Sequence, residues 1–169
     1  MSWPAWAGDA PTWVTTAAVF FAGGQLVLDR RRRETEEDRA SKHQASKLSA
    51  WAVSDRQSQP LAFGVVVSNR SDSTFHNVAV DAFIHHKQCT QISLTVLPPG
   101  EYFVELDQKN SADHRNWAWE YAVEQREHGR SLRAYTGTEG YSVLSIAFTD
   151  NLDQRWRADK HMVLRRVAS

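Results

Sequence analysis

The 169-residue chain contains a single cysteine, Cys89. A single cysteine excludes an intrachain disulfide and any zinc site built from several cysteines. Such sparse use fits a reducing compartment, where thiols stay reduced.

An excess of either charge sign is also missing, since 20 Lys and Arg residues balance 20 Asp and Glu residues. General nucleic-acid binders usually carry a strong basic excess. We therefore expect no nucleic-acid partner. The length and the ordinary apolar content suffice for one folded domain of modest size.

Motifs that would identify an enzyme are missing as well. The glycines are dispersed, and Gly137 and Gly140 lack the strand-to-helix setting and the following lysine of a phosphate-binding loop. No GxSxG nucleophile elbow occurs. His85, His86 and Cys89 suggest a metal site, but adjacent histidines on a strand point to opposite faces, so only one could share a site. We expect no enzyme, no cofactor and no metal, and we rank a metal-dependent hydrolase last among the functional options.

One long apolar run is present, from Trp13 to Leu28, and it ends at Asp29 and four consecutive arginines. These membrane-proximal basic residues are Arg30, Arg31, Arg32 and Arg33. An apolar helix followed by clustered arginine is typical of a membrane anchor whose C-terminal side is cytoplasmic. Extended back to Ala10, the run approaches the ~20 residues that a spanning helix needs. The charges follow the run instead of preceding it, so a cleaved signal peptide is not expected.

We therefore predict a transmembrane helix within residues 1–29, a single-pass location in the cell membrane and contact with membrane lipid. A buried or interfacial helix of a soluble protein is the alternative. Small residues would let two such helices approach closely, so a homodimer stays open; they are Ala18, Ala22, Gly23 and Gly24.

Residues 30–54 are predicted to form a charged helical stalk. The segment from Arg30 to about Ala52 holds no Pro or Gly and ranks well in helix propensity. Ala45, Leu48 and Ala52 make a narrow apolar stripe at helical spacing, which predicts that the last turns dock on the following domain. Recognition of lipid headgroups by the arginines is a further option.

Residues 55–169 are predicted to form a β-domain, because alternating apolar residues replace helical spacing after Ser54. Alternating segments occur at residues 61–67, 78–84, 92–96 and 102–106, followed by a hairpin at 142–149 and 154–157. Residues 160–167 are expected to add either a short last strand or an ordered tail. Polar or Pro-Gly turns separate them, and no crossover helices intervene. This pattern predicts a mainly β, immunoglobulin-like antiparallel β-sandwich.

The segment from Asp107 to Gly140 allows two interpretations. Tryptophans two residues apart, Trp117 and Trp119, favour a strand, whereas NWAWEYAVEQREHG suits a helix that ends at Gly129. We favour a helix over residues 117–127. The aromatic residues Trp117, Trp119 and Tyr121 are the predicted partner-binding surface, with core packing as the alternative role.

Several short motifs carry a resemblance to a known group of proteins. They are QASKLSAW (44–51), VVVSNRSDSTFHNVAV (65–80), LPPGE (97–101) and FTDNLDQRW (148–156). In this order, after an apolar helix, they resemble actinobacterial single-pass membrane-anchored β-sandwich proteins of unknown function. The resemblance implies one anchor and one sandwich domain, with no activity or ligand attached.

The favoured functional hypothesis is a non-enzymatic, membrane-tethered protein whose cytoplasmic sandwich presents an edge strand or a loop face to a protein partner. The alternative is an extracytoplasmic ligand-binding or structural module with a reversed anchor, against the charge bias.

Overall fold

The computed structural model describes residue 25 and residues 29–33, 35–107, 118–129 and 131–167. The chain divides into two compact units, Met1–Ser41 and Lys42–Ser169. In the first unit, residues 29–33 and 35–41 are helical, and the four arginines are exposed. The hydroxyl of Thr35 donates to the Arg31 carbonyl at 2.8 Å, one helical turn back. The helix expected after Arg30 is confirmed for these residues.

The anchor expected at residues 13–28 lies outside the described residues, with the exception of Gln25. Among the helices that the structure does describe, none is long and apolar enough to cross a bilayer.

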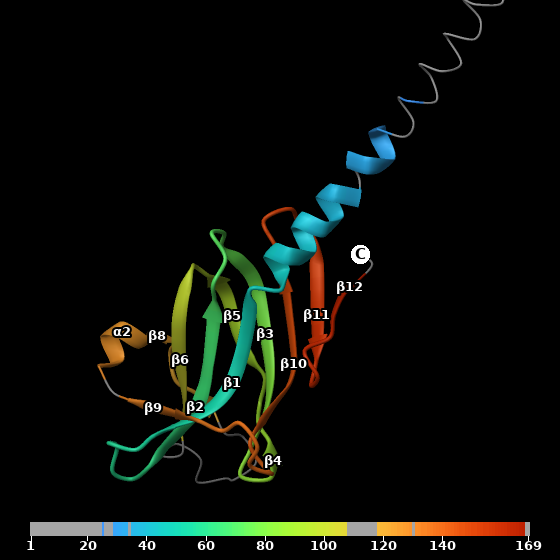
Figure 1. Ribbon diagram of the computed structural model, residues 1–169. Helices are drawn as coiled ribbons and strands as arrows, with labels where there is room; N and C mark the ends of the chain where they lie inside the picture. The colour runs from blue at the N-terminus through green and yellow to red at the C-terminus, as the bar shows by residue number, and fades with distance from the viewer. Residues whose placement is uncertain (1–24, 26–28, 34, 108–117, 130, 168–169) are drawn as a thin grey trace, which may run out of the picture. The chain divides into compact units, whose positions relative to one another are not determined.

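The second unit is mainly β and forms two antiparallel sheets (Figure 1). The first sheet has the order β7-β6-β2-β1-β9, with β8 also paired to β6. Its strands are β1 (Leu48–Asp55), β2 (Ala62–Asn69), β6 (Gly100–Asp107), β7 (Ala118–Trp119), β8 (Val123–Glu124) and β9 (Leu132–Ala134). The short helix α2 (Gln125–His128) follows β8.

The second sheet has the order β12-β11-β10-β3-β4, and β5 also pairs with β3. Its strands are β3 (Phe75–Ile84), β4 (Lys87–Gln88), β5 (Ile92–Leu97), β10 (Ser142–Thr149), β11 (Arg155–Asp159) and β12 (Leu164–Val167). Every strand predicted from alternation is present in these two sheets, and the β-sandwich-like fold is confirmed.

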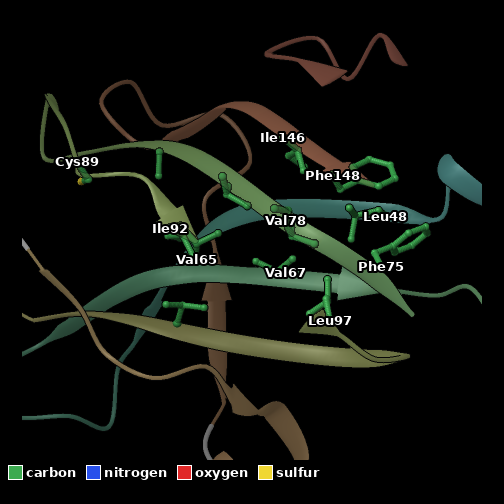
Figure 2. Close-up of a cluster of buried hydrophobic side chains, with 14 of the residues drawn as sticks. Leu48, Val65, Val67, Phe75, Val78, Cys89, Ile92, Leu97, Ile146 and Phe148 are labelled. Atoms are coloured by element: carbon green, nitrogen blue, oxygen red, sulfur yellow. The ribbon is translucent and has the colours of Figure 1, made fainter. Parts of the chain in front are cut away.

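The main core lies between the two sheets, where their apolar faces meet (Figure 2). Val65 and Val67 of β2 are completely buried in the same cluster as Val78 of β3 and Ile146 of β10. This arrangement follows from strand geometry, because alternate residues point to one face. Predicted inward residues of β2 are therefore confirmed, except that Leu61 precedes the strand and is exposed.

A second, smaller cluster covers the other face of the first sheet. Val53, Val66 and Phe103 are buried there, with Trp51 and Leu132 packed against them. Gly64 makes room for this cluster, because a Cβ at that position would lie 2.5 Å from the Phe103 ring. Both faces of β2 are thus buried, beyond the alternate residues Phe63, Val65 and Val67 that the sequence predicted to point inward.

The helical prediction for residues 46–52 was wrong. Helix ends at residue 45, and the chain enters β1 at Leu48. The apolar stripe misled because residues four apart, such as Leu48 and Ala52, share a face in a strand as well as in a helix. Pairing with β2 along the whole of β1 decides for the strand.

The favoured helix at residues 117–127 was also wrong over most of its described length. Ala118–Trp119 and Val123–Glu124 are strands paired with β6, and only Gln125–His128 is helical. The expected stop is confirmed, because Gly129 caps α2 in the left-handed conformation with φ 65°. Trp119 is paired with Leu106 of β6. Helix propensity depends on local sequence only and therefore could not predict this pairing between separate segments.

Candidate docking groove beside strand β1

One side of β1 is only half covered by a neighbouring strand. Strand β2 pairs with β1 from Leu48 to Asp55, whereas β9 on the opposite side pairs only with Val53, Ser54 and Asp55. In Figure 1, β9 accordingly lies beside one end of β1. Among the described residues, the last backbone hydrogen bond on this side runs from the Tyr135 N–H to the Ala52 carbonyl, at 3.0 Å.

The backbone of Ala50 points to the same uncovered side. Backbone groups alternate between the two sides of a strand, so the N–H and C=O of Ala50 follow the direction of the Ala52 carbonyl. No strand within the described ranges pairs with Ala50 from that side. Ala50 is 9% exposed and its side chain packs in the main core, so only its backbone donor and acceptor, where they line the groove beyond the end of β9, would be available on this side.

A groove of about 500 Å³ lies beside this open edge. One wall is β1, and the others come from the loop after β9, the start of β10 and the turn between β11 and β12. The lining residues are Ala50, Trp51, Ala52, Tyr135, Thr136, Gly137, Thr138, Glu139, Tyr141, Ser142, Val143, Lys160 and Met162. Aromatic side chains and unpaired backbone groups thus lie together, as they do where extended peptides bind.

Stacked aromatic rings form part of the groove wall. Tyr135 and Tyr141 stack with ring centroids 4.3 Å apart, and Phe63 lies 5.7 Å from Tyr141. The rings of His85 and Phe63 pack edge to face with their centroids 4.1 Å apart, and the His85 Nδ1 is 2.7 Å from the Tyr141 hydroxyl. The tyrosines are therefore held in place by the core and by the turn between β3 and β4.

That turn consists of two histidines in the left-handed region, with φ 53° at His85 and 60° at His86. Two-residue hairpin turns with positive φ usually contain Asn and Gly, so the pair costs backbone strain. Gly140 accommodates His86, because a Cβ at Gly140 would lie 2.7 Å from the imidazole. The His86 N–H also donates to the Gly140 carbonyl at 3.3 Å. The turn thereby positions the loop after β9, which forms one wall of the groove.

The titratable groups behind the groove favour their neutral forms. Burial lowers the pKa of His85, and the neighbouring His86 lowers it further. Burial raises the pKa of Tyr141, and Tyr135 adds to that rise. Near neutral pH this wall is therefore uncharged and linked by the Tyr141–His85 hydrogen bond.

The three histidine and cysteine candidates for a metal site do not converge. His85 and His86 form the turn, while Cys89 is buried and burial raises the pKa of its thiol. Over the described ranges, no group of three His, Cys, Asp or Glu side chains is placed to hold a metal ion.

The predicted partner-binding residues lie elsewhere. Trp117 is outside the described residues. Trp119 packs partly buried against the main core, and its indole N–H donates to the Thr90 carbonyl at 2.7 Å. Tyr121 is 92% exposed, and both aromatic residues line a separate depression of about 360 Å³. The structure thus brings Trp119 and Tyr121 to one surface, apart from the groove beside β1.

Sequence analysis did not identify the groove residues. Ala50 to Ala52 were assigned to a helix, and the segment from Thr136 to Tyr141 contains no motif beyond a turn. The alternation in LSAWAVSD was the one available signal for β1, whereas its incomplete pairing depends on where β9 ends.

Comparisons of the chain with protein-family models, with curated proteins and with solved structures give no match.

Proposed function

We propose that this protein is a non-enzymatic, membrane-tethered adaptor whose β-domain binds an extended segment of a partner protein. The single observation that carries the proposal is the half-covered strand β1 beside an aromatic groove. An added strand would lie on the same side of β1 as β9, beyond the end of β9, and would pair with the N–H and C=O of Ala50. No enzymatic role is proposed.

The chemistry of the groove defines the partner segment. Alternate side chains of an added strand point to opposite faces. Trp51, Tyr135 and Tyr141 supply aromatic surface for such side chains, while Glu139 and Lys160 place one charge of each sign at the lining. An extended segment with apolar residues at alternate positions and little net charge fits these walls.

The tether belongs to the same proposal. The apolar run that ends at Arg30–Arg33 supports a single-pass anchor, because arginine resists translocation and favours a cytoplasmic β-domain. The resemblance to actinobacterial anchored proteins described above implies the same architecture, one anchor followed by an immunoglobulin-like sandwich. A homodimer through the anchor would present two grooves on one membrane.

Photo-crosslinking of the full-length chain in its native membrane tests the binding mode. A photo-reactive residue replaces Thr138 or Lys160, which contribute to different walls of the groove. We expect both positions to label one short segment of the same partner protein. Labelling of unrelated proteins, or of distant segments, would contradict strand addition.

Ala50→Pro is the decisive variant, because proline removes the N–H that faces the open edge. Proline is tolerated where an edge strand directs its N–H to solvent, so pairing with β2 should persist. Because Ala50 packs in the main core, we expect a modest drop in the unfolding temperature, and loss of the crosslink at temperatures where the domain is still folded. Ser49→Pro is the matched control: its N–H points toward β2, and the domain should unfold at lower temperature.

A second variant covers the case in which Ala50→Pro fails to fold. A Cβ added at Gly137 would have no atom within 4 Å, so a side chain can start there, and we expect the indole of Gly137→Trp to occupy part of the groove. Thr95→Trp, at an exposed position of β5, is its control. The proposal is wrong if Gly137→Trp preserves the crosslink as well as Thr95→Trp does.

A further inference from the structure

The β11–β12 hairpin concentrates positive charge in a chain that is neutral overall. Between positions 155 and 167, five cationic residues accompany a single carboxylate, Asp159. The cationic residues are Arg155, Arg157, Lys160, Arg165 and Arg166.

Three of these arginines share the outer face of the second sheet. Trp156 and Ala158 are buried, so Arg155 and Arg157 point away from the core. Arg165 is directly opposite Arg157 in the ladder and therefore lies on the same face. We call Arg155, Arg157 and Arg165 the hairpin arginine face.

This face carries an electrostatic cost in the isolated domain. Like charges directly opposite each other on neighbouring strands are destabilising. Within the described part of the chain, no carboxylate lies at ion-pair distance from any of the three arginines. Asp159, the carboxylate of β11, accepts the N–H groups of His161 and Val163 and so closes the turn. Its pKa is lowered first by the Val163 N–H, and the charge of Arg165 adds to that lowering, so Asp159 offsets part of the positive charge of this face. An external anion would offset the repulsion between Arg157 and Arg165.

Apolar side chains lie beside the arginines. Three arginines and two exposed valines line one open depression of about 470 Å³, together with Leu144, Ser145 and the carboxylate Asp159; they are Arg157, Arg165, Arg166, Val163 and Val167. Val163 is 48% exposed and Val167 is 43% exposed. Guanidinium groups next to exposed aliphatic groups suit the boundary between phosphate headgroups and acyl chains, where arginine can bind phosphate oxygens in a bidentate manner.

We propose that the hairpin arginine face docks on anionic phospholipid headgroups of the membrane that holds the tether. The choice of lipid rests on charge complementarity and on the proposed tether, which keeps the domain beside an anionic leaflet. The contact is separate from strand addition at β1, because it uses the outer face of the second sheet. It would orient the domain on the membrane.

Fluorescence of the reconstituted full-length chain tests this contact. Val163→Cys carries an environment-sensitive label, and the buried Cys89 is shielded from labelling. We expect a blue shift in vesicles of phosphatidylcholine with phosphatidylglycerol, and none in phosphatidylcholine alone. Salt at about 1 M, where the Debye length is ~3 Å, should reverse the shift. A label at Tyr121→Cys should not respond.

Charge variants identify the residues involved. Each arginine replaced by glutamine should reduce the ratio of docked to undocked protein about fivefold, so Arg157→Gln with Arg165→Gln removes most of the shift. Arg133→Gln, at an exposed position of β9, is the matched control. Equal responses of the double variant and of this control would overturn the proposal.

The failures of tether and hairpin are distinguishable. The tether is tested by flotation of the full-length chain with vesicles in a density gradient. If the chain floats with vesicles of either composition but the label at Val163→Cys emits at the same wavelength in both, the hairpin proposal is wrong and the tether stands. If the chain does not float with phosphatidylcholine vesicles, the tether is wrong. A shift produced by a DNA duplex but not by anionic vesicles would overturn lipid docking in favour of nucleic-acid binding.

Discussion

The indole N–H of Trp119 donates a hydrogen bond of 2.7 Å to the carbonyl of Thr90. Trp119 lies on β7 of the first sheet, while Thr90 precedes β5 of the second. One side chain therefore links the two sheets at an edge of the domain, and it also packs on the main core.

Trp119→Ala should destabilise the domain, because it removes both the packing and the link between the sheets. We expect a loss of about 3 kcal/mol in the free energy of unfolding, measured by chemical denaturation. Trp119→Phe, which keeps most of the packing, should cost about 1 kcal/mol. Tyr121→Ala should change stability by less than about 0.5 kcal/mol, because Tyr121 is exposed. Equal effects of the Trp119→Ala and Tyr121→Ala changes would contradict this assignment.

Gly64→Ala should be strongly destabilising, although alanine is small. The added Cβ would lie 2.3 Å from the Val104 carbonyl oxygen and 2.5 Å from the Phe103 ring, so β2 and β6 must separate. We expect a cost of about 3 kcal/mol. Gly137→Ala is the control, since its Cβ would enter open space. Thermal unfolding of both variants checks the prediction, which fails if their midpoints coincide.

Asp150→Ala should destabilise the C-terminal hairpin. The buried carboxylate accepts the Trp156 indole N–H at 2.8 Å and the backbone N–H groups of Leu152 and Gln154 at 2.9 Å. Its removal leaves a buried indole N–H without an acceptor, for which we expect a loss of about 3 kcal/mol. Trp156 fluorescence during denaturation reports the change. Asp72→Ala, at an exposed loop position, should have little effect.

His85 should make the domain less stable in mild acid. Its folded pKa lies below the ordinary value of 6.5, so the unfolded chain binds a proton more readily. The contribution is fully present above pH 6.5 and is lost as the pH falls toward the lowered pKa. His85→Asn tolerates the positive φ and does not titrate. Unfolding midpoints between about pH 7.5 and pH 5.5 should fall less steeply for this variant than for the wild type; identical slopes would contradict the assignment.

The predictability of each segment depended on how local its signal is. Segments 61–67, 78–84 and 102–106 were predicted because alternation needs only neighbouring residues. Leu48 to Ala52 was not, since spacing by four residues fits a helix and a strand alike. For Ala118 to Glu124, the pairing with β6 outweighed local helix propensity.

The candidate site was less predictable than the fold. Aromatic content pointed to Trp119 and Tyr121, and the structure places this pair beside Thr90. The groove instead combines Ala50 with Tyr135 and Tyr141, which follow it by more than eighty residues in the sequence. These residues form a candidate site only because the pairing between β9 and β1 stops at Val53 and leaves the rest of that side of β1 without a ladder partner.

The sequence by itself determined the mainly β character of the domain, the positions of most strands and turns, the absence of a disulfide and the clustering of Arg30–Arg33. These properties follow from periodicity and composition, which are local. The tertiary structure alone decided which strands pair, which side of β1 stays uncovered and which arginines share a face. Those properties depend on contacts between distant segments, whose free energy no local pattern contains.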